Sequence, residues 1–72
     1  MFLIKSENNA YIKGATWGAK TDADQFTTVA DAVERIRSFH GKVMDQNIEE
    51  TGATVAMSGN PRDFRIYNVV KA

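Results

Sequence analysis

One segment constrains the fold more than any other, because residues 28–41 carry the apolar spacing of an amphipathic α-helix. The apolar positions recur at intervals of three and four: Val29, Ala32, Val33 and Ile36, with Phe39 or His40 extending the same face. Thr28 is the expected N-cap, with Asp31 completing a capping-box-like arrangement, and Gly41 is the expected C′ residue that stops the helix. Since one helix cannot cover both faces of a sheet, a sheet built from the rest of the chain would leave one face open to solvent or to a partner.

The segments around this helix favour strands. A strand at residues 2–4 and a second at 10–17, joined by the Asn8-Asn9 turn, are expected to form an antiparallel hairpin. Residues 18–25 are polar and are expected to be a loop. Three further strands are expected at residues 42–50, 54–58 and 63–70, separated by a turn at Thr51-Gly52 and by the breaker Gly59-Asn60-Pro61. The predicted fold is α+β in the order β-β-α-β-β-β, with one amphipathic helix packed on one face of a mostly antiparallel sheet of four to five strands.

The alternation within these strands predicts which side chains share a face. In the third strand Met44, Gln46 and Ile48 are expected on one face and Val43 on the other. In the fourth, Val55 and Met57 are expected to point inward. In the fifth, Phe64, Ile66 and Val70 alternate with Arg65, Tyr67 and Val69, and the pattern alone does not decide which set is buried.

The chain has 72 residues and no cysteine, so we expect a single domain spanning residues 1–72, near the lower limit for a fold without disulfides. Stability must then come from apolar burial or from oligomerisation. The first apolar run is too short for a signal-peptide core, and no run approaches the roughly 20 residues of a membrane span. The expected location is the cytoplasm of a bacterial host.

The residues that enzymes need are scarce. There is one histidine, and neither Gly14 nor Gly18 lies in a phosphate-loop context. One histidine and scattered carboxylates do not predict a zinc site. We therefore expect no catalytic residues, no metal and no cofactor, and interpret the chain as a binding protein.

Net charge is zero, which argues against both a dedicated DNA binder and an acidic DNA mimic. The charges are nevertheless blocky. Arg35, Arg37 and Lys42 form a block without an acid, which is either a solvated face that compensates the helix dipole or a contact patch for an acidic partner or phosphate.

Aromatic residues supply the other candidate contacts. Trp17, the single tryptophan, either packs in the core or serves as an exposed anchor of an interface. Tyr67 beside Arg65 either packs at a sheet edge or lies on a surface that stacks nucleobases or fills a protein pocket. His40 is either a helix-end residue or a ligand contact.

Residues 34–44, Glu-Arg-Ile-Arg-Ser-Phe-His-Gly-Lys-Val-Met, resemble a segment of the small type I-F anti-CRISPR proteins of bacteriophages. The shared pattern is Arg-Ile on an amphipathic helix followed by F-H-G-x-V-M, and it covers about a quarter of the chain. The resemblance implies a phage inhibitor that docks on a CRISPR surveillance complex and interferes with DNA recognition, and Arg35 matches a basic helix position of that family.

Three functions follow as hypotheses. The first is a non-enzymatic, protein-binding inhibitor from a phage or mobile element, with a CRISPR-Cas effector subunit as the expected partner and Arg35, Arg37, Lys42, Trp17, Arg65 and Tyr67 as contacts. The second is a small nucleic-acid-binding module that uses the face carrying Arg65 and Tyr67. The third is a structural homo-oligomer, such as a homodimer, that pairs through the uncovered sheet face.

Overall fold

A computed structural model of the chain describes residues 1–60 and 63–72. Its strands are β1 (Phe2–Ser6), β2 (Tyr11–Lys13), β3 (Thr16–Gly18), β4 (Lys42–Glu49), β5 (Gly52–Asn60) and β6 (Asp63–Lys71). Its helices are a single 3-10 turn, η1 (Lys20–Asp22), and the α-helix α1 (Val29–Arg37). Within the described residues, no helix is both long enough and apolar enough to cross a bilayer.

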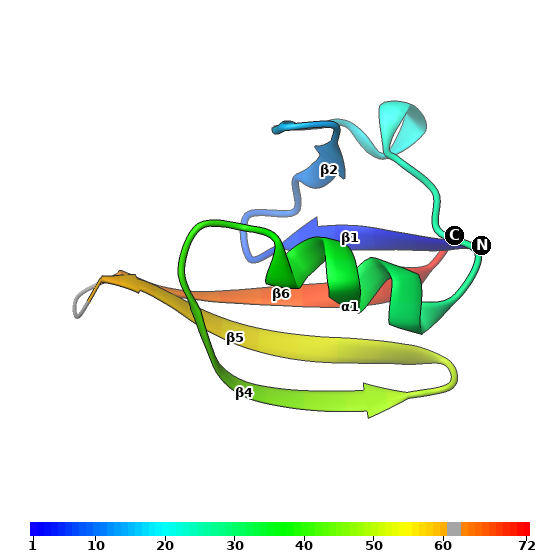
Figure 1. Cartoon of the computed structure of the whole chain (residues 1–72). Coiled ribbons are helices and arrows are strands. Elements are labelled where there is room, and N and C mark those ends of the chain that lie inside the picture. Colours follow the sequence, from blue (N-terminus) through cyan, green and yellow to red (C-terminus); the bar gives the residue numbers. More distant parts are fainter. Residues whose placement is uncertain (61–62) are drawn as a thin grey trace.

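The strands form one antiparallel sheet in the order β3-β2-β1-β6-β5-β4, and α1 lies across one face of it (Figure 1). The α+β class and the single helix on one face are confirmed. The sheet has six strands rather than four to five, because residues 10–17 form two strands and not one. Gly14 takes a φ of 58°, and the chain reverses there so that Lys13 pairs with Thr16.

The remaining expected boundaries differ by a few residues. The expected loop at 18–25 contains η1, the β4–β5 turn ends before Gly52, and β5 runs through Gly59 to Asn60 although these residues were expected to break it. Pro61, the third residue of that predicted breaker, lies outside the described residues.

The start of α1 follows the capping prediction, whereas its end does not. Thr28 is the N-cap, and its Oγ1 accepts a hydrogen bond from the Asp31 N–H at 3.1 Å. The helix ends at Arg37 with Ser38 as C-cap, so the prediction that Gly41 stops it is wrong. Gly41 serves the entry into β4 instead: its φ is 131°, and a Cβ there would lie 3.0 Å from the Ser58 carbonyl oxygen.

Removing the N-cap should destabilise the fold measurably. Thr28→Ala leaves the Asp31 N–H without its side-chain acceptor, so we expect a loss of about 1 kcal/mol in the free energy of unfolding. Urea denaturation followed by far-UV circular dichroism measures it. Thr27→Ala is the matched control, because Thr27 is an exposed neighbour outside the cap, and equal losses in the two variants would contradict the assignment.

The core lies between α1 and the sheet. Ile36 of the helix, Ile4 of β1 and Val55 of β5 are fully buried, and Met57 and Val69 pack in the same cluster. The inward orientation predicted for Val55 and Met57 is confirmed.

The register also settles the two faces of β6. Tyr67 pairs with Val55, and Arg65 with Met57, so both lie on the helix side, and the uncovered face carries Phe64, Ile66 and Val70.

A bulge in β4 overturns the predicted faces of that strand. The register shifts between Val43 and Asp45, so one extra residue, Met44, is inserted opposite β5. Val43 pairs with Met57 and Ile48 with Ala53, which places both on the helix side. The prediction that Val43 and Ile48 lie on opposite faces of the sheet is therefore wrong, because strict alternation of side chains fails across a bulge.

Candidate binding groove

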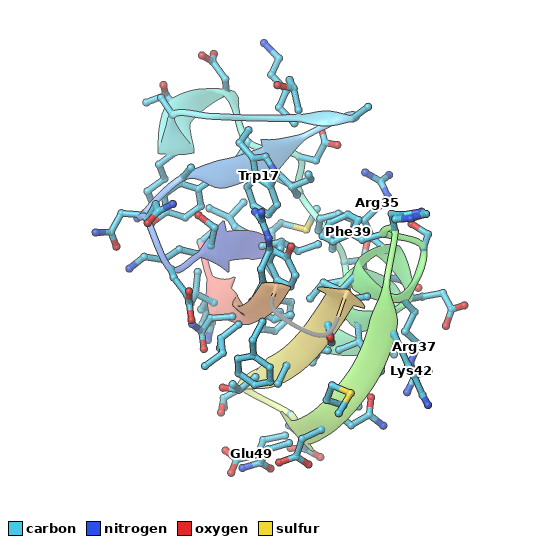
Figure 2. All side chains as sticks on the ribbon, turned by 90° about the vertical axis from the view of Figure 1, so that its left-hand side faces the viewer. Trp17, Arg35, Arg37, Phe39, Lys42 and Glu49 are labelled. Carbon is cyan, nitrogen blue, oxygen red and sulfur yellow. The ribbon has the colours of Figure 1, made fainter. Side chains whose placement is uncertain are left out.

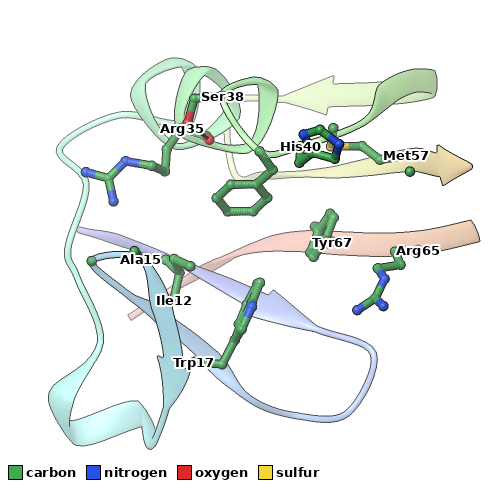
Figure 3. A pocket seen from close by; sticks show the side chains of 12 residues that line it. Ile12, Ala15, Trp17, Arg35, Ser38, His40, Met57, Arg65 and Tyr67 are labelled. Carbon is green, nitrogen blue, oxygen red and sulfur yellow. Dashed lines mark hydrogen bonds between the residues drawn. The ribbon is translucent and has the colours of Figure 1, made fainter. Parts of the chain in front are cut away.

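A groove of about 780 Å³ opens on the helix side of the sheet, between the β2–β3 hairpin and the segment that follows α1. Its apolar lining includes Ile12, Trp17, Phe39, Met57 and Tyr67, and its polar lining includes Arg35, Ser38, His40 and Arg65. Figure 3 shows Arg35 and Arg65 toward opposite ends, with Trp17 and Tyr67 between them. A second hollow of about 200 Å³ adjoins it and shares Trp17, Arg65 and Tyr67.

Three aromatic rings from separate parts of the chain meet in this groove. Trp17 and Tyr67 stack, with ring centroids 5.6 Å apart and planes 7° from parallel. Phe39 meets both rings edge-on, at 5.9 Å from Trp17 and 5.3 Å from Tyr67. Such offset and edge-to-face contacts are favourable beyond the area they bury. The rings therefore hold the β2–β3 hairpin, the end of α1 and strand β6 together.

The two alternatives for Trp17 and Tyr67 coexist in the structure. Tyr67 is half-buried and packs against the core, so it is not a residue of an open sheet surface. Trp17 covers Tyr67 and still exposes 37% of its own surface. The pair is thus a fixed aromatic stack, and its outer ring, Trp17, is accessible to a partner.

A partly exposed ion pair between Arg35 and Asp24 fixes one end of the groove. Arg35 Nη1 donates to Asp24 Oδ2 at 3.1 Å, and the same oxygen accepts the Gly14 N–H at 2.8 Å. Arg35 also lies over the Phe26 ring at 5.3 Å. Asp24 therefore ties the β2–β3 turn to α1.

These contacts make the stability of the fold depend on pH. The Gly14 N–H first, and the Arg35 guanidinium second, lower the pKa of Asp24 from 3.8 against an opposing effect of burial. A depressed pKa in the folded state contributes stability that is present above the unfolded value and lost as pH falls through the folded one. Because both side chains are more than a third exposed, solvent screening keeps this contribution small.

Asp24→Asn should therefore lower the free energy of unfolding at neutral pH. It should also reduce the decrease of that free energy below about pH 4, since the carboxylate at position 24 is no longer there to be protonated. Thermal unfolding of wild type and variant across pH 2–7 measures it. Asp22→Asn, which removes an exposed carboxylate two residues away, is the control. An acid profile for Asp24→Asn identical to wild type would contradict this role.

The predicted basic block does not form one patch. Arg35 lines the groove, whereas Arg37 donates to Gln46 Oε1 at 2.9 Å and pairs with Glu34 at 3.6 Å. Lys42 is exposed on β4 and pairs with Ser58, on the sheet face away from α1. Figure 2 shows Arg37 and Lys42 apart from Trp17. The block separates because α1 ends at Arg37 and the chain then turns into β4.

Phe39, which lines the groove, and Asp24, which pairs with the groove residue Arg35, were not among the predicted site residues. Phe39 was assigned to the apolar face of a longer helix, and only the early helix end directs it toward Trp17. Asp24 had no sequence signal as a partner of Arg35, because eleven positions separate them. His40, weighed as a ligand contact, is exposed and lines the groove.

The groove offers aromatic surface, cationic side chains and a hydroxyl, a set suited to binding apolar or aromatic groups beside acidic ones. Within residues 1–60 and 63–72, no three His, Cys, Asp or Glu side chains gather closely enough to hold a metal ion. Comparison with protein-family models, curated proteins and solved structures found no match to this chain.

Proposed function

We propose that this chain is a non-enzymatic binding protein that holds a protein partner in the aromatic groove between the β2–β3 hairpin and the end of α1. The observation that carries the proposal is Trp17, which is fixed by Tyr67 and Phe39 yet leaves more than a third of its surface exposed in a concave site. A preorganised aromatic side chain binds at little conformational cost, and tryptophan is enriched among the residues that dominate binding energy.

The charges at the groove ends support a partner segment that carries an apolar or aromatic side chain next to an acidic one. Arg65 is exposed at one end, and Arg35 is half-buried at the other beside Asp24.

The finer proposal is a phage-encoded inhibitor that acts in the bacterial cytoplasm by covering the working surface of a CRISPR-Cas effector complex. Phe39 and His40 of the F-H-G-x-V-M segment both line the groove, which supports using the same segment for docking. A type I-F surveillance complex incubated with the protein should lose binding to its target DNA. Undiminished DNA binding at saturating protein would restrict the proposal to another protein target.

Affinity capture from bacterial lysate, with and without nuclease, tests the general proposal. A stoichiometric protein partner should survive nuclease treatment. Arg65→Glu should abolish its capture, because Arg65 lines the groove, whereas Arg37→Glu should not, because Arg37 faces Gln46 outside it. Equal capture by both variants would place the contact elsewhere.

A single-stranded nucleic acid is the second candidate, because the exposed Trp17 ring between two arginines can also stack a base. Trp17 is the only tryptophan, so its fluorescence reports directly on the groove. Quenching by an oligonucleotide that weakens steeply with salt would support this candidate, and unchanged fluorescence at low salt would eliminate it.

A further inference from the structure

The sheet face opposite α1 carries exposed and half-buried apolar side chains on β5 and β6, whereas Leu3 of β1, on the same face, is buried. Alternation and register place Phe64, Ile66 and Val70 of β6 on this face, next to Ala56 of β5. Phe64 is 57% exposed and is the second residue of β6, next to the end where Asp63 pairs with Asn60 of β5. Exposed aromatic side chains grouped with aliphatic ones on a sheet mark interaction surfaces.

On this face, the residues that pair across neighbouring strands form transverse rows, or levels. One level is polar: Lys5 of β1 pairs with Asn68, Asn68 with Thr54, and Thr54 with Asn47 of β4. Thr54 Oγ1 donates to Asn68 Oδ1 at 3.0 Å within this level. On either side of it lie apolar levels, with Ile66 beside Ala56 and Leu3 beside Val70.

Charge divides this face from one side to the other. Lys5 stands on the β1 side at the level of Asn47. On the β4 side Asp45 and Glu49 lie two residues before and two residues after Asn47, so the two acids bracket the level of Lys5. The four-stranded part of the face therefore carries one base on the β1 side and, around the same level, two acids on the β4 side, with Lys42 farther along β4 at the level of Ser58.

We infer that this face pairs with the same face of a second copy, about a two-fold axis parallel to the strands between β5 and β6. With that axis, each level of one copy faces the same level of the other copy. The order of the strands is reversed, so β4 of one copy lies over β1 of the other. Lys5 then faces the gap between the partner's Asp45 and the partner's Glu49. A two-fold axis across the strands would instead place β4 on β4, with acids opposite acids.

Side-chain size favours the same arrangement. Phe64 projects from β6 next to Ser58 of β5, and Ala56 is the next residue of β5 on this face. Reversing the strand order places the Phe64 ring of each copy over these small side chains of the other copy. A large ring over small residues allows two sheets to approach to about 10 Å, the ordinary distance between packed sheets.

This dimer uses the face opposite the groove and does not depend on the proposed function. Sedimentation velocity from micromolar to near-millimolar protein should show a monomer–dimer equilibrium. Phe64→Lys should raise the dissociation constant at least about tenfold, as expected when an aromatic contact of an interface is replaced by a charge. Ala30→Lys, which adds the same charge at an exposed position of α1, should leave it unchanged.

A charge exchange tests the orientation. Lys5→Glu and Glu49→Lys should each weaken the dimer, and the two together should recover most of the loss, because the pair is restored across the axis. A monomer at every concentration, or a dimer that Phe64→Lys does not weaken, would overturn the inference and leave the face to a different occupant. A double variant weaker than either single one would overturn the two-fold arrangement.

Discussion

Ile36→Ala should remove a large share of the free energy of unfolding. Ile36 is fully buried, and it packs between α1 and the central strands in the core cluster. Replacing such a side chain by alanine costs about 2–5 kcal/mol, because apolar contacts are lost and the cavity only partly collapses. A domain of 72 residues has a total stability of roughly 4–11 kcal/mol, so the loss is a large share of the whole.

Ile48→Ala makes the same chemical change where the structure predicts little effect. Ile48 lies on the helix side of β4 but is 45% exposed, so its truncation should cost about 1 kcal/mol or less. Urea denaturation of both variants, followed by circular dichroism, gives the two free energies of unfolding. Equal losses would mean that α1 does not pack on the sheet as described.

Gly52→Ala should cost about 1–3 kcal/mol although it adds a single methyl group. Gly52 begins β5 after the β4–β5 turn, and a Cβ there would lie 2.6 Å from the Val69 carbonyl oxygen of β6. The obstacle is the β6 backbone that pairs with β5, so β5 and β6 must separate locally before the methyl group fits.

Gly18→Ala is the matched control for this effect, because a Cβ on Gly18 meets nothing within 4 Å. That variant should stay within about 1 kcal/mol of wild type. Thermal unfolding compares the two, with the separation of their melting temperatures as the readout. Similar melting temperatures would show that β5 and β6 are not held at the close spacing that Gly52 permits.

The sequence predicts those parts of the fold that local patterns specify. The N-cap at Thr28 has its own chemical signature, and the spacing from Val29 to Ile36 reports burial on one helix face. Alternation likewise places Val55 and Met57 in the core. These features need no knowledge of distant neighbours, and each agrees with the structure.

The parts that depend on tertiary contacts were predicted less well. The helix ends at Arg37 rather than near Gly41, and this early end directs Phe39 toward Trp17 and Tyr67. The β4 bulge changes the face of every residue beyond Met44, and nothing in the local pattern of that strand signals it. The groove was therefore predicted only through its members Trp17, Arg35, Arg65 and Tyr67, without the arrangement that brings them together.

We expect the partner to bind the groove around Trp17 and not the open sheet face. Titration calorimetry of the captured partner against wild type, Trp17→Ala and Phe64→Ala distinguishes the two faces, with circular dichroism confirming that each variant is folded. Both variants remove one exposed aromatic ring, but from opposite faces. The structure predicts that Trp17→Ala weakens binding at least about thirtyfold, as for a residue that dominates an interface, and that Phe64→Ala leaves it unchanged. Unchanged binding by folded Trp17→Ala would contradict the claim, and loss of binding by Phe64→Ala alone would move the site to the open face.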